Sequence, residues 1–253
     1  MMIEELKKVI VQSHYPVVLC GNDMLKECGI LPLRSQERAY EIERIYRHSP
    51  EEFLSQAFYS TRPEPFYHFY RNEILKYFDA PVKVFCLLRD FQKLASVRCI
   101  ITNSFFGFPS RAGCKHVIEL HGNINHNTCD QCGAVFSADY VLHSKRCPVC
   151  DQCGGPIRPG IIFYGDMVNN RLMTMAATEI SHADTLLMLG CSLDTELARR
   201  YIKYFEGNKL ILVHSEHHYL DGEADLSVYG SITDTLHMLN HYLGLGKVGK
   251  YGQ

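Results

Sequence analysis

Two copies of the pentapeptide CDQCG carry the clearest chemical signal in the sequence. The first copy begins at Cys129 and the second at Cys150, with seventeen residues between Cys132 and Cys150. In each copy two thiolates are close enough in the chain to bind one metal ion, and the glycine that follows permits a tight turn. Four thiolates complete the tetrahedral shell of Zn²⁺ and leave no position open for a substrate. The spacing therefore predicts a structural zinc site, with Cys129, Cys132, Cys150 and Cys153 as its ligands.

A third CxxC pair leaves the choice of ligands partly open. Cys147 and Cys150 also form such a pair, with fourteen residues between Cys132 and Cys147, just short of the usual range. Only the pair Cys150 and Cys153 is followed by glycine, as in the first copy, so we predict Cys147 to be a nearby spare thiol. A disulfide pair is the alternative for these cysteines. Because eleven cysteines are an odd number in a chain of this length, a reducing compartment is favoured, and we predict a cytoplasmic location.

The segments around these cysteines alternate between apolar runs and helical patterns. Apolar runs predict strands at residues 16–20, 97–102, 116–120, 161–164, 185–189 and 210–213. Helical patterns occupy residues 1–10, a segment ending near Gly29, parts of 35–78 with breaks at Pro50 and Pro63, 170–180, a segment from 195, and 233–243. An aromatic cluster at 66–70 is expected to pack in the core. This alternation predicts an α/β protein, with a parallel sheet covered by helices on both faces and interrupted by the cysteine segment.

Small and polar residues follow the predicted strands. They occupy positions 21–23, 103–107, 121–122, 190–193 and 214–216. In open parallel sheets ligands bind at the carboxyl ends of the strands, so these segments are candidate binding loops. His121 has the residue type of a general base, since an imidazole ordinarily titrates at about pH 6.5. A single histidine after a strand is more often structural, and the sheet alone does not define the chemistry.

Composition excludes several classes of function. The chain has 253 residues, of which 46% are hydrophobic and 21% charged, which is enough for one large core and a smaller inset. A net charge of -2, with only Lys145 and Arg146 adjacent in the cysteine segment, predicts no nucleic-acid partner. Residues 1–10 mix acids and lysines in an amphipathic pattern, without the apolar run of a signal peptide. No stretch is long enough to cross a bilayer, so no membrane association is predicted.

The order of motifs resembles that of the sirtuin family over nearly the whole chain. The matching motifs are RAG at 111–113, ELHG at 119–122, the two cysteine pairs, GxxRP at 155–159, IIFYGD at 161–166, and GCSL at 190–193. The family reads VVWFGE where this chain has IIFYGD, and GTSL where it has GCSL. Each motif is weak alone, but their order along the chain is specific.

The resemblance implies a Rossmann-like parallel sheet with helices on both faces, a small domain of zinc ribbon and helical insert, and NAD in the cleft between them. On this basis the large domain comprises residues 1–34, 79–122 and 156–253. The helical insert comprises residues 35–78, and the zinc-ribbon module residues 123–155. The implied activity is NAD-dependent deacylation of protein lysine, in which the acyl group moves to ADP-ribose and nicotinamide is released. The implied partner is an acylated-lysine protein or peptide.

The resemblance also assigns roles to individual residues. His121, in the ELHG motif, is the implied base that takes a proton from a ribose hydroxyl. An acylated peptide is implied to pair as an added strand with Ile162, Phe163, Tyr164 and Gly165. The implied NAD-binding residues are Gly21, Asn22, Arg34, Asn103, Ser104, Gly190, Cys191, Ser192 and His214.

The chain departs from the family where the nucleotide is expected. Asp23 replaces a glycine of the family's GAG turn and adds a negative charge, although aspartate also suits a helix cap. The family's TQNID reads TNSFF at 102–106, and Phe106 cannot accept a hydrogen bond from an amide. Pro109 replaces a family histidine, and His214 an asparagine. We therefore predict weak activity, with two alternatives: an impaired pseudoenzyme that binds a nucleotide or peptide, or an ADP-ribosyltransferase.

Overall fold

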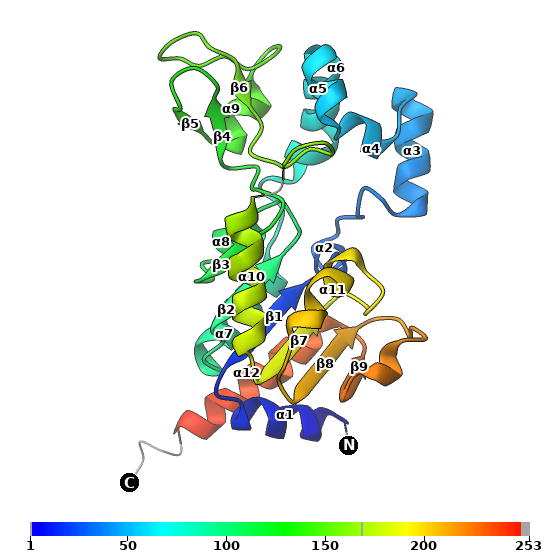
Figure 1. The fold of residues 1–253 in the computed structure, drawn as a ribbon, viewed down its shortest axis with the longest axis vertical. Coiled ribbons are helices and arrows are strands. Elements are labelled where there is room, and N and C mark those ends of the chain that lie inside the picture. The colour runs from blue at the N-terminus through cyan, green and yellow to red at the C-terminus, as the bar shows by residue number, and fades with distance from the viewer. Residues whose placement is uncertain (1, 168, 249–253) are drawn as a thin grey trace.

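A six-stranded parallel sheet forms the larger part of the molecule in the computed structural model, which describes residues 2–167 and 169–248 (Figure 1). Its strand order is β3-β2-β1-β7-β8-β9. The bounds are β1 Pro16–Cys20, β2 Cys99–Thr102, β3 Val117–Glu119, β7 Thr185–Leu189, β8 Lys209–His214 and β9 Leu226–Tyr229. Strand β1 is central, with Val17 paired to Cys99 of β2 and to Leu186 of β7. The chain leaves β1 toward one side of the sheet and returns on the other, which places a crevice at the carboxyl ends of β1 and β7.

Helices cover both faces of this sheet because its strands are apolar on both sides. Val18 and Leu187 belong to one buried cluster, and their neighbours Val17 and Leu186 to the other. The first cluster includes side chains from α1 Met2–Gln12, α7 Lys83–Leu94 and α12 Ile232–Val248; the second includes side chains from α10 Asn170–His182 and α11 Glu196–Tyr201. The predicted α/β class with a parallel sheet covered on both faces is confirmed.

The second part of the molecule combines helices with a small antiparallel sheet of order β5-β4-β6 (upper part of Figure 1). Its strands are β4 Asn127–Cys129, β5 Val135–Phe136 and β6 Ile157–Arg158. The helices are α3 Gln36–Tyr46, α4 Pro50–Phe53, α5 Gln56–Thr61, α6 Pro63–Phe69, the π-helical turn η1 Tyr70–Ile74, the 3-10 turn η2 Leu75–Tyr77, and α9 Ala138–His143. Pro50 and Pro63 each lie in the first turn of a helix, where the missing N–H costs no hydrogen bond.

Aromatic rings fill the interior of this second part. Phe66, Phe69 and Tyr70 are fully buried, as expected for the aromatic cluster in the sequence. Phe69 stacks on Phe53 with ring centroids 4.2 Å apart, and Phe66 stacks on Tyr70 at 5.3 Å. Such ring pairs add to the free energy gained by burial. The Tyr67 hydroxyl donates to the carbonyl of Ile157, which ties the helices to the small sheet.

Four segments differ from the sequence prediction. Residues 161–164 do not form a strand of the parallel sheet; they make isolated bridges, Ile161 with Gly122 and Tyr164 with Ser55. The segment leaves the small sheet and crosses between two loops, so it makes one bridge near each end instead of a continuous ladder with the large sheet. Strand β9 and helix α7 were not predicted, and the helix after Gly21 is shorter than expected, with α2 spanning only Asp23–Lys26. The remaining short elements are α8 Phe108–Arg111, η3 Ile202–Tyr204 and η4 Asp221–Glu223.

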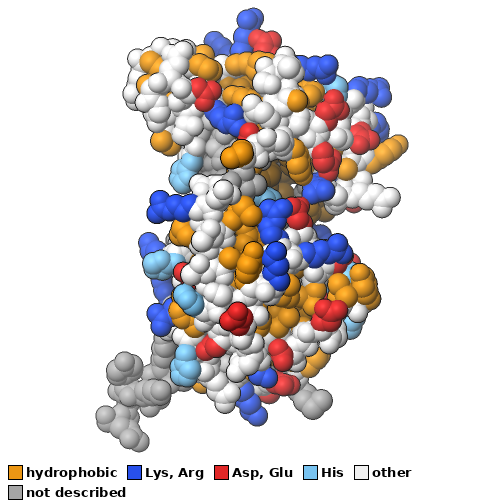
Figure 2. All heavy atoms as spheres, viewed as in Figure 1, with side chains coloured by type: hydrophobic (Ala, Val, Ile, Leu, Met, Phe, Trp, Pro, Cys, Tyr) orange, Lys and Arg blue, Asp and Glu red, His pale blue; other side chains and the backbone are white. Residues whose placement is uncertain are grey.

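The surface carries both signs of charge. On the face shown in Figure 2, basic and acidic side chains are interspersed. The molecule narrows between the part with the small antiparallel sheet and the part with the large parallel sheet. Among the described residues, no helix has the length and apolar character needed to cross a bilayer.

Candidate active site

Two adjoining cavities lie at the carboxyl ends of β1, β2, β7 and β8. The first has a volume of about 200 Å³ and is lined by seven of the predicted NAD-binding residues: Gly21, Asn22, Asn103, Gly190, Cys191, Ser192 and His214. The second has a volume of about 280 Å³ and is lined by His121 together with Arg34, Ser104, Ile162, Phe163, Tyr164 and Gly165. Asn22 and Asn103 line both cavities, so the two share a wall. Residues from distant parts of the sequence that were predicted to form one site therefore lie together.

The first cavity depends on a close approach of two glycines. The N–H of Gly21 donates to the carbonyl of Leu189 at 2.8 Å, which continues the pairing of β1 and β7 beyond the strands. A Cβ atom at Gly21 would lie 2.4 Å from the oxygen of Gly190 and 2.3 Å from the Cβ of Cys191. Gly190 has a φ of 69°, a backbone conformation that residues with side chains rarely adopt. These two glycines let the chain turn out of both strands beside the cavity.

Asp23 does not cap a helix, so the alternative offered for it is wrong. Asn22 occupies the N-cap position of α2 without a side-chain hydrogen bond, and Asp23 is the first helical residue. The Asp23 carboxylate pairs with Nζ of Lys26 at 2.8 Å, because residues three apart share one face of a helix. Asp23 also lines the first cavity. Lys26 thus partly offsets the negative charge that Asp23 brings to a site for an anionic diphosphate.

His121 is half-buried between β3 and the second cavity. Burial is the main cause that lowers its pKa, since an imidazolium is poorly solvated there; Glu196 acts in the opposite direction and Arg200 in the same direction as burial. The carbonyl of His121 accepts a hydrogen bond from the N–H of Ile162 at 3.0 Å. Burial of the ring therefore favours the neutral imidazole, the form able to accept a proton.

Glu196 and Arg200 of α11 are site residues that the sequence reading missed. Both line the second cavity and a smaller cavity of about 20 Å³ that also contacts His121. Nη2 of Arg200 lies 2.9 Å from Oε1 of Glu196, four residues earlier on the same helix. An oppositely charged pair at that spacing, directly after the GCSL motif, was the signal available in the sequence.

The extended segment 161–166 is fixed at several points. Tyr164 donates its N–H to Leu54 at 2.8 Å and accepts from Gln56 at 2.9 Å. Asp166 makes two contacts with Nη2 of Arg158, at 2.9 and 2.8 Å, and accepts from the N–H of Phe163 at 2.8 Å. The N–H groups of Ile162, Phe163 and Tyr164 are thus all bonded within the chain.

Phe106 stands in the wall of the second cavity. Its side chain is only 4% exposed, and its ring stacks on Phe108 with centroids 5.2 Å apart. The rings of Tyr77 and Phe106 are arranged edge to face, with their centroids 6.4 Å apart. The neighbouring Ser104 is buried, with its hydroxyl 3.4 Å from the N–H of Phe106. This end of the cavity is therefore mainly apolar.

The far end of the first cavity is lined by histidines. His214 is buried, and its Nε2 lies 3.3 Å from Oδ2 of the buried Asp221, a contact without hydrogen-bond geometry. Tyr229 and the N–H of His218 donate to the same oxygen at 3.0 and 2.7 Å. Glu216, from the candidate binding loop 214–216, also lines this cavity, as do His217 and His218, which were not predicted. These residues come soon after the end of β8, and that position was the signal in the sequence for a place in the site.

The cysteines predicted as zinc ligands converge at the edge of the small sheet. The Sγ atoms of Cys129, Cys132, Cys150 and Cys153 all lie within 4.8 Å of one another. Cys129 and Cys153 are 3.5 Å apart, and Cys132 and Cys150 are 3.6 Å apart. Sulfurs around a tetrahedral zinc, each about 2.3 Å from the metal, are about 3.8 Å apart. The group therefore fits zinc, and all eleven cysteines are free thiols rather than disulfides.

The repeated pentapeptide folds the same way twice. Gly133 and Gly154 have φ values of 73° and 74°, and each donates its N–H to the carbonyl of the first cysteine of its copy, at 3.0 and 2.9 Å. Cys147 is not part of the sulfur group; it is half-buried and packs against the hydrophobic core. The pair with the following glycine thus provides the last two sulfurs.

Comparisons with known proteins agree with this geometry. A family model described as the Sir2 family matches residues 21–196. An NAD-dependent protein deacetylase of Clostridium acetobutylicum is 34% identical over 92% of this chain and 96% of its own length. A crystal structure of a Sir2 homolog–NAD complex superposes with a TM-score of 0.83 at 27% identity, covering 97% of this chain and 95% of that one. A Sir2–p53 peptide–NAD⁺ structure gives a TM-score of 0.79 at 26% identity, covering 97% and 100% of the two chains. The chain belongs to the Sir2 family.

Proposed function

We propose that this protein is an NAD-dependent protein lysine deacylase, which moves an acyl group from lysine to ADP-ribose and releases nicotinamide. The observation that carries the proposal is the adjacency of the two cavities, which have Asn22 and Asn103 in common and His121 at the second. A base near a ribose and a groove for an extended peptide are what the reaction requires. The curated relative from Clostridium acetobutylicum has the same activity in its name, at 34% identity.

The site residues have different roles in this reaction. Gly21, Gly190 and Ser192 would admit the diphosphate half of NAD near backbone N–H groups, and Asn103 lines both cavities. When bound, NAD supplies the ribose carbon that accepts the acyl oxygen as nicotinamide leaves. His121 accepts the proton of a ribose hydroxyl, and its lowered pKa keeps the imidazole neutral for that step. The acylated peptide lies along residues 162–165.

The remaining assignments concern structure and location. We assign the sheet domain to residues 1–34, 79–122 and 156–253, the helical insert to 35–78, and the zinc-ribbon module to 123–155. Zinc held by four thiolates shapes the ribbon and takes no part in the reaction, because no coordination position stays open. A cytoplasmic location follows from eleven free thiols, which persist in a reducing compartment.

The test is nicotinamide release from NAD in the presence of an acetylated peptide. The native protein is expected to release nicotinamide and to deacylate the peptide in equal amounts. His121→Ala is expected to lower kcat by about 100-fold or more, while the Kd for NAD changes little. Native protein that releases no nicotinamide with acetyl, propionyl or longer acyl peptides would refute the proposal.

Phe106 favours a second candidate function, a nucleotide-binding protein without turnover. Its apolar ring lines the cavity beside Ser104, where a carboxamide would find no acceptor on that side chain. Calorimetry separates the two candidates. Binding of ADP-ribose without binding of NAD indicates that Phe106 excludes nicotinamide, whereas similar affinities for both support the deacylase.

A further inference from the structure

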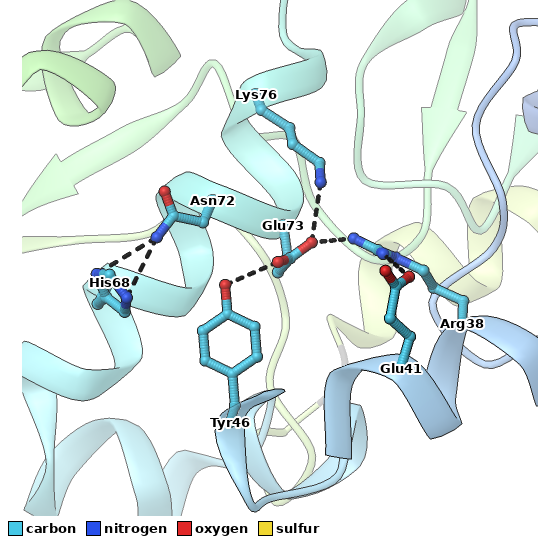
Figure 3. Close-up of polar contacts among 7 residues, drawn as sticks. All are labelled: Arg38, Glu41, Tyr46, His68, Asn72, Glu73 and Lys76. Carbon is cyan, nitrogen blue, oxygen red and sulfur yellow. Dashed lines mark hydrogen bonds and ion pairs between the residues drawn. The ribbon is translucent and has the colours of Figure 1, made fainter. Parts of the chain in front are cut away.

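Glu73 is a buried carboxylate that lies outside both cavities, in the π-helical turn η1 (Figure 3). Three side chains donate to it. The Tyr46 hydroxyl lies 2.7 Å from Oε1, Lys76 Nζ lies 3.0 Å from Oε2, and Arg38 donates to Oε2 as well. A carboxylate this buried is costly to leave without its partners, so the four side chains form one unit.

Two of the three donors belong to helix α3. Arg38 lies near the start of that helix and Tyr46 is its last residue. The apolar contribution to its packing is small, because Ile42 is its buried residue, while Tyr40 and Ile45 are 71% and 54% exposed. The Tyr46 ring also contacts Phe53 and Phe69 edge-on. The attachment of α3 therefore depends largely on Glu73.

Helix α3 continues directly from a segment that lines the active site. Pro32, Leu33 and Arg34 form part of the wall of the cavity that contains His121. Within this segment Ser35 donates to Pro32 at 2.9 Å, a bond that closes only a local turn. The ion pair of Arg34 with Glu51 involves side chains that are 60% and 43% exposed, and exposed pairs contribute little. Leu33 packs against the hydrophobic core, and the Arg34 guanidinium lies 6.0 Å from the centroid of the Tyr164 ring. These contacts and the adjoining helix α3 together set the position of the segment.

We propose that Glu73 is a positioning residue for the NAD site: through Arg38 and Tyr46 it holds helix α3, and thereby holds residues 32–34 against the cavity. The inference rests on the proposed function, since it assumes that NAD occupies the two cavities. Loss of the Glu73 charge releases α3 and the segment before it. NAD then binds to a wall that has to be ordered on binding, which weakens affinity.

Arg71, in the same turn, provides a matched control. It reaches the other way, with Nε 3.1 Å from the carbonyl of Val141 and Nη2 2.6 Å from the Ser144 hydroxyl. Those partners lie at the end of α9, between the two pairs of cysteines. Arg71 also donates to the carbonyl of Arg146, so Arg71→Gln disturbs the same helical turn and three polar contacts, as many as Glu73 makes, without touching α3.

The experiment compares Glu73→Gln and Arg71→Gln with the native protein, by NAD titration calorimetry and amide hydrogen exchange. Glu73→Gln is expected to raise the Kd and the KM for NAD by about tenfold, with kcat changed less than about twofold. The amides of residues 36–46 are expected to exchange at least about tenfold faster, while those of β1 and β7 keep their native rates. Arg71→Gln is expected to speed exchange at 138–146 and to leave the Kd for NAD unchanged.

Two results would overturn the proposal. One is an unchanged Kd for NAD in Glu73→Gln; the other is an equal rise in both variants, which would indicate general loosening. If Glu73→Gln does not fold, Tyr46→Phe removes one donor only, and the same shifts are expected at about threefold. Calorimetry needs no turnover, so a native protein that binds NAD without releasing nicotinamide refutes the deacylase assignment and still allows this test.

Discussion

The cysteine cluster and the pair of cavities are stabilised in opposite ways. The four sulfurs come from residues 24 positions apart at most, and Cys132 and Cys153 are exposed to solvent. Their neighbouring strands β5 and β6 are two residues long. The cavities draw on segments from Gly21 to His218, and the strands beneath them are fully buried. Metal coordination has to hold the first region, whereas packing of the sheet holds the second.

This difference determines what each region tolerates. Strands as short as β5 and β6 bury too little apolar surface to stay folded alone, so the small sheet depends on its metal. The cavity loops leave strands that are already fixed, so losing one side-chain contact there is expected to change affinity rather than folding. Substitutions that would push two closely packed backbone segments apart are the exception, because buried strands cannot separate without losing their packing.

Removal of zinc should produce the largest effect. Cys132→Ser leaves three thiolates, and we expect loss of zinc and a fall in kcat/KM of about 100-fold or more, because the small sheet unfolds beside the site. Zinc content by mass spectrometry and deacylation of an acetylated peptide measure the two effects. Cys147→Ser is the control, since Cys147 lies outside the sulfur group, and it should retain one zinc per chain. Zinc loss in the control would mean that Cys147 is a ligand.

A methyl group at Gly21 should produce the next largest effect. The added Cβ would lie 2.4 Å from the oxygen of Gly190, so β1 and β7 would have to separate at the cavity. We expect Gly21→Ala to lower the free energy of unfolding by about 1–3 kcal/mol and to weaken NAD binding by about tenfold. Urea denaturation and calorimetry measure these values. Gly222→Ala is the control, because its Cβ would meet no atom within 4 Å; a loss of similar size there would contradict the steric explanation.

The same contrast explains what the sequence predicts. Local signals succeed: the two pentapeptides predict the four sulfurs that converge, and the glycine after each pair distinguishes Cys153 from Cys147. The apolar runs predict five of the six parallel strands, because strands buried on both faces are apolar throughout. The edge strand β9 is short and has alternating burial, so its sequence LSVY gives no such run.

What the sequence does not predict depends on neighbours distant in the chain. Residues 161–164 are as apolar as a strand, but they lie between Gly122 and Ser55 and make only a single bridge to each, away from the large parallel sheet. Glu196 and Arg200 look like an ordinary surface pair on a helix until α11 is packed beside His121. The attachment of α3 by Glu73 links residues 35 positions apart through polar atoms, which leave no periodic pattern.

The smallest predicted effect concerns the pKa of His121, the proposed base in the packed region. Burial lowers the pKa of His121, so the neutral imidazole persists below the ordinary value of about 6.5, and the acid limb of kcat/KM should lie below that pH. His121 has its ordinary pKa of about 6.5 in the unfolded chain and a lower pKa in the folded chain. At a pH between these two values, the unfolded chain binds the proton more readily than the folded chain. The stability due to neutral His121 is therefore complete above about pH 6.5, and it is lost as pH falls through the lowered value.

Charge substitutions on α11 should move this limb in opposite directions. The Glu196 carboxylate raises the pKa of His121 and the Arg200 guanidinium lowers it, in each case through the charge alone. Glu196→Gln should shift the limb to lower pH, and Arg200→Gln should shift it to higher pH. Glu4→Gln breaks an exposed pair with Lys7 on α1 and should leave the profile unchanged. Shifts of the same sign in both α11 variants would show that altered packing, rather than charge, governs the base.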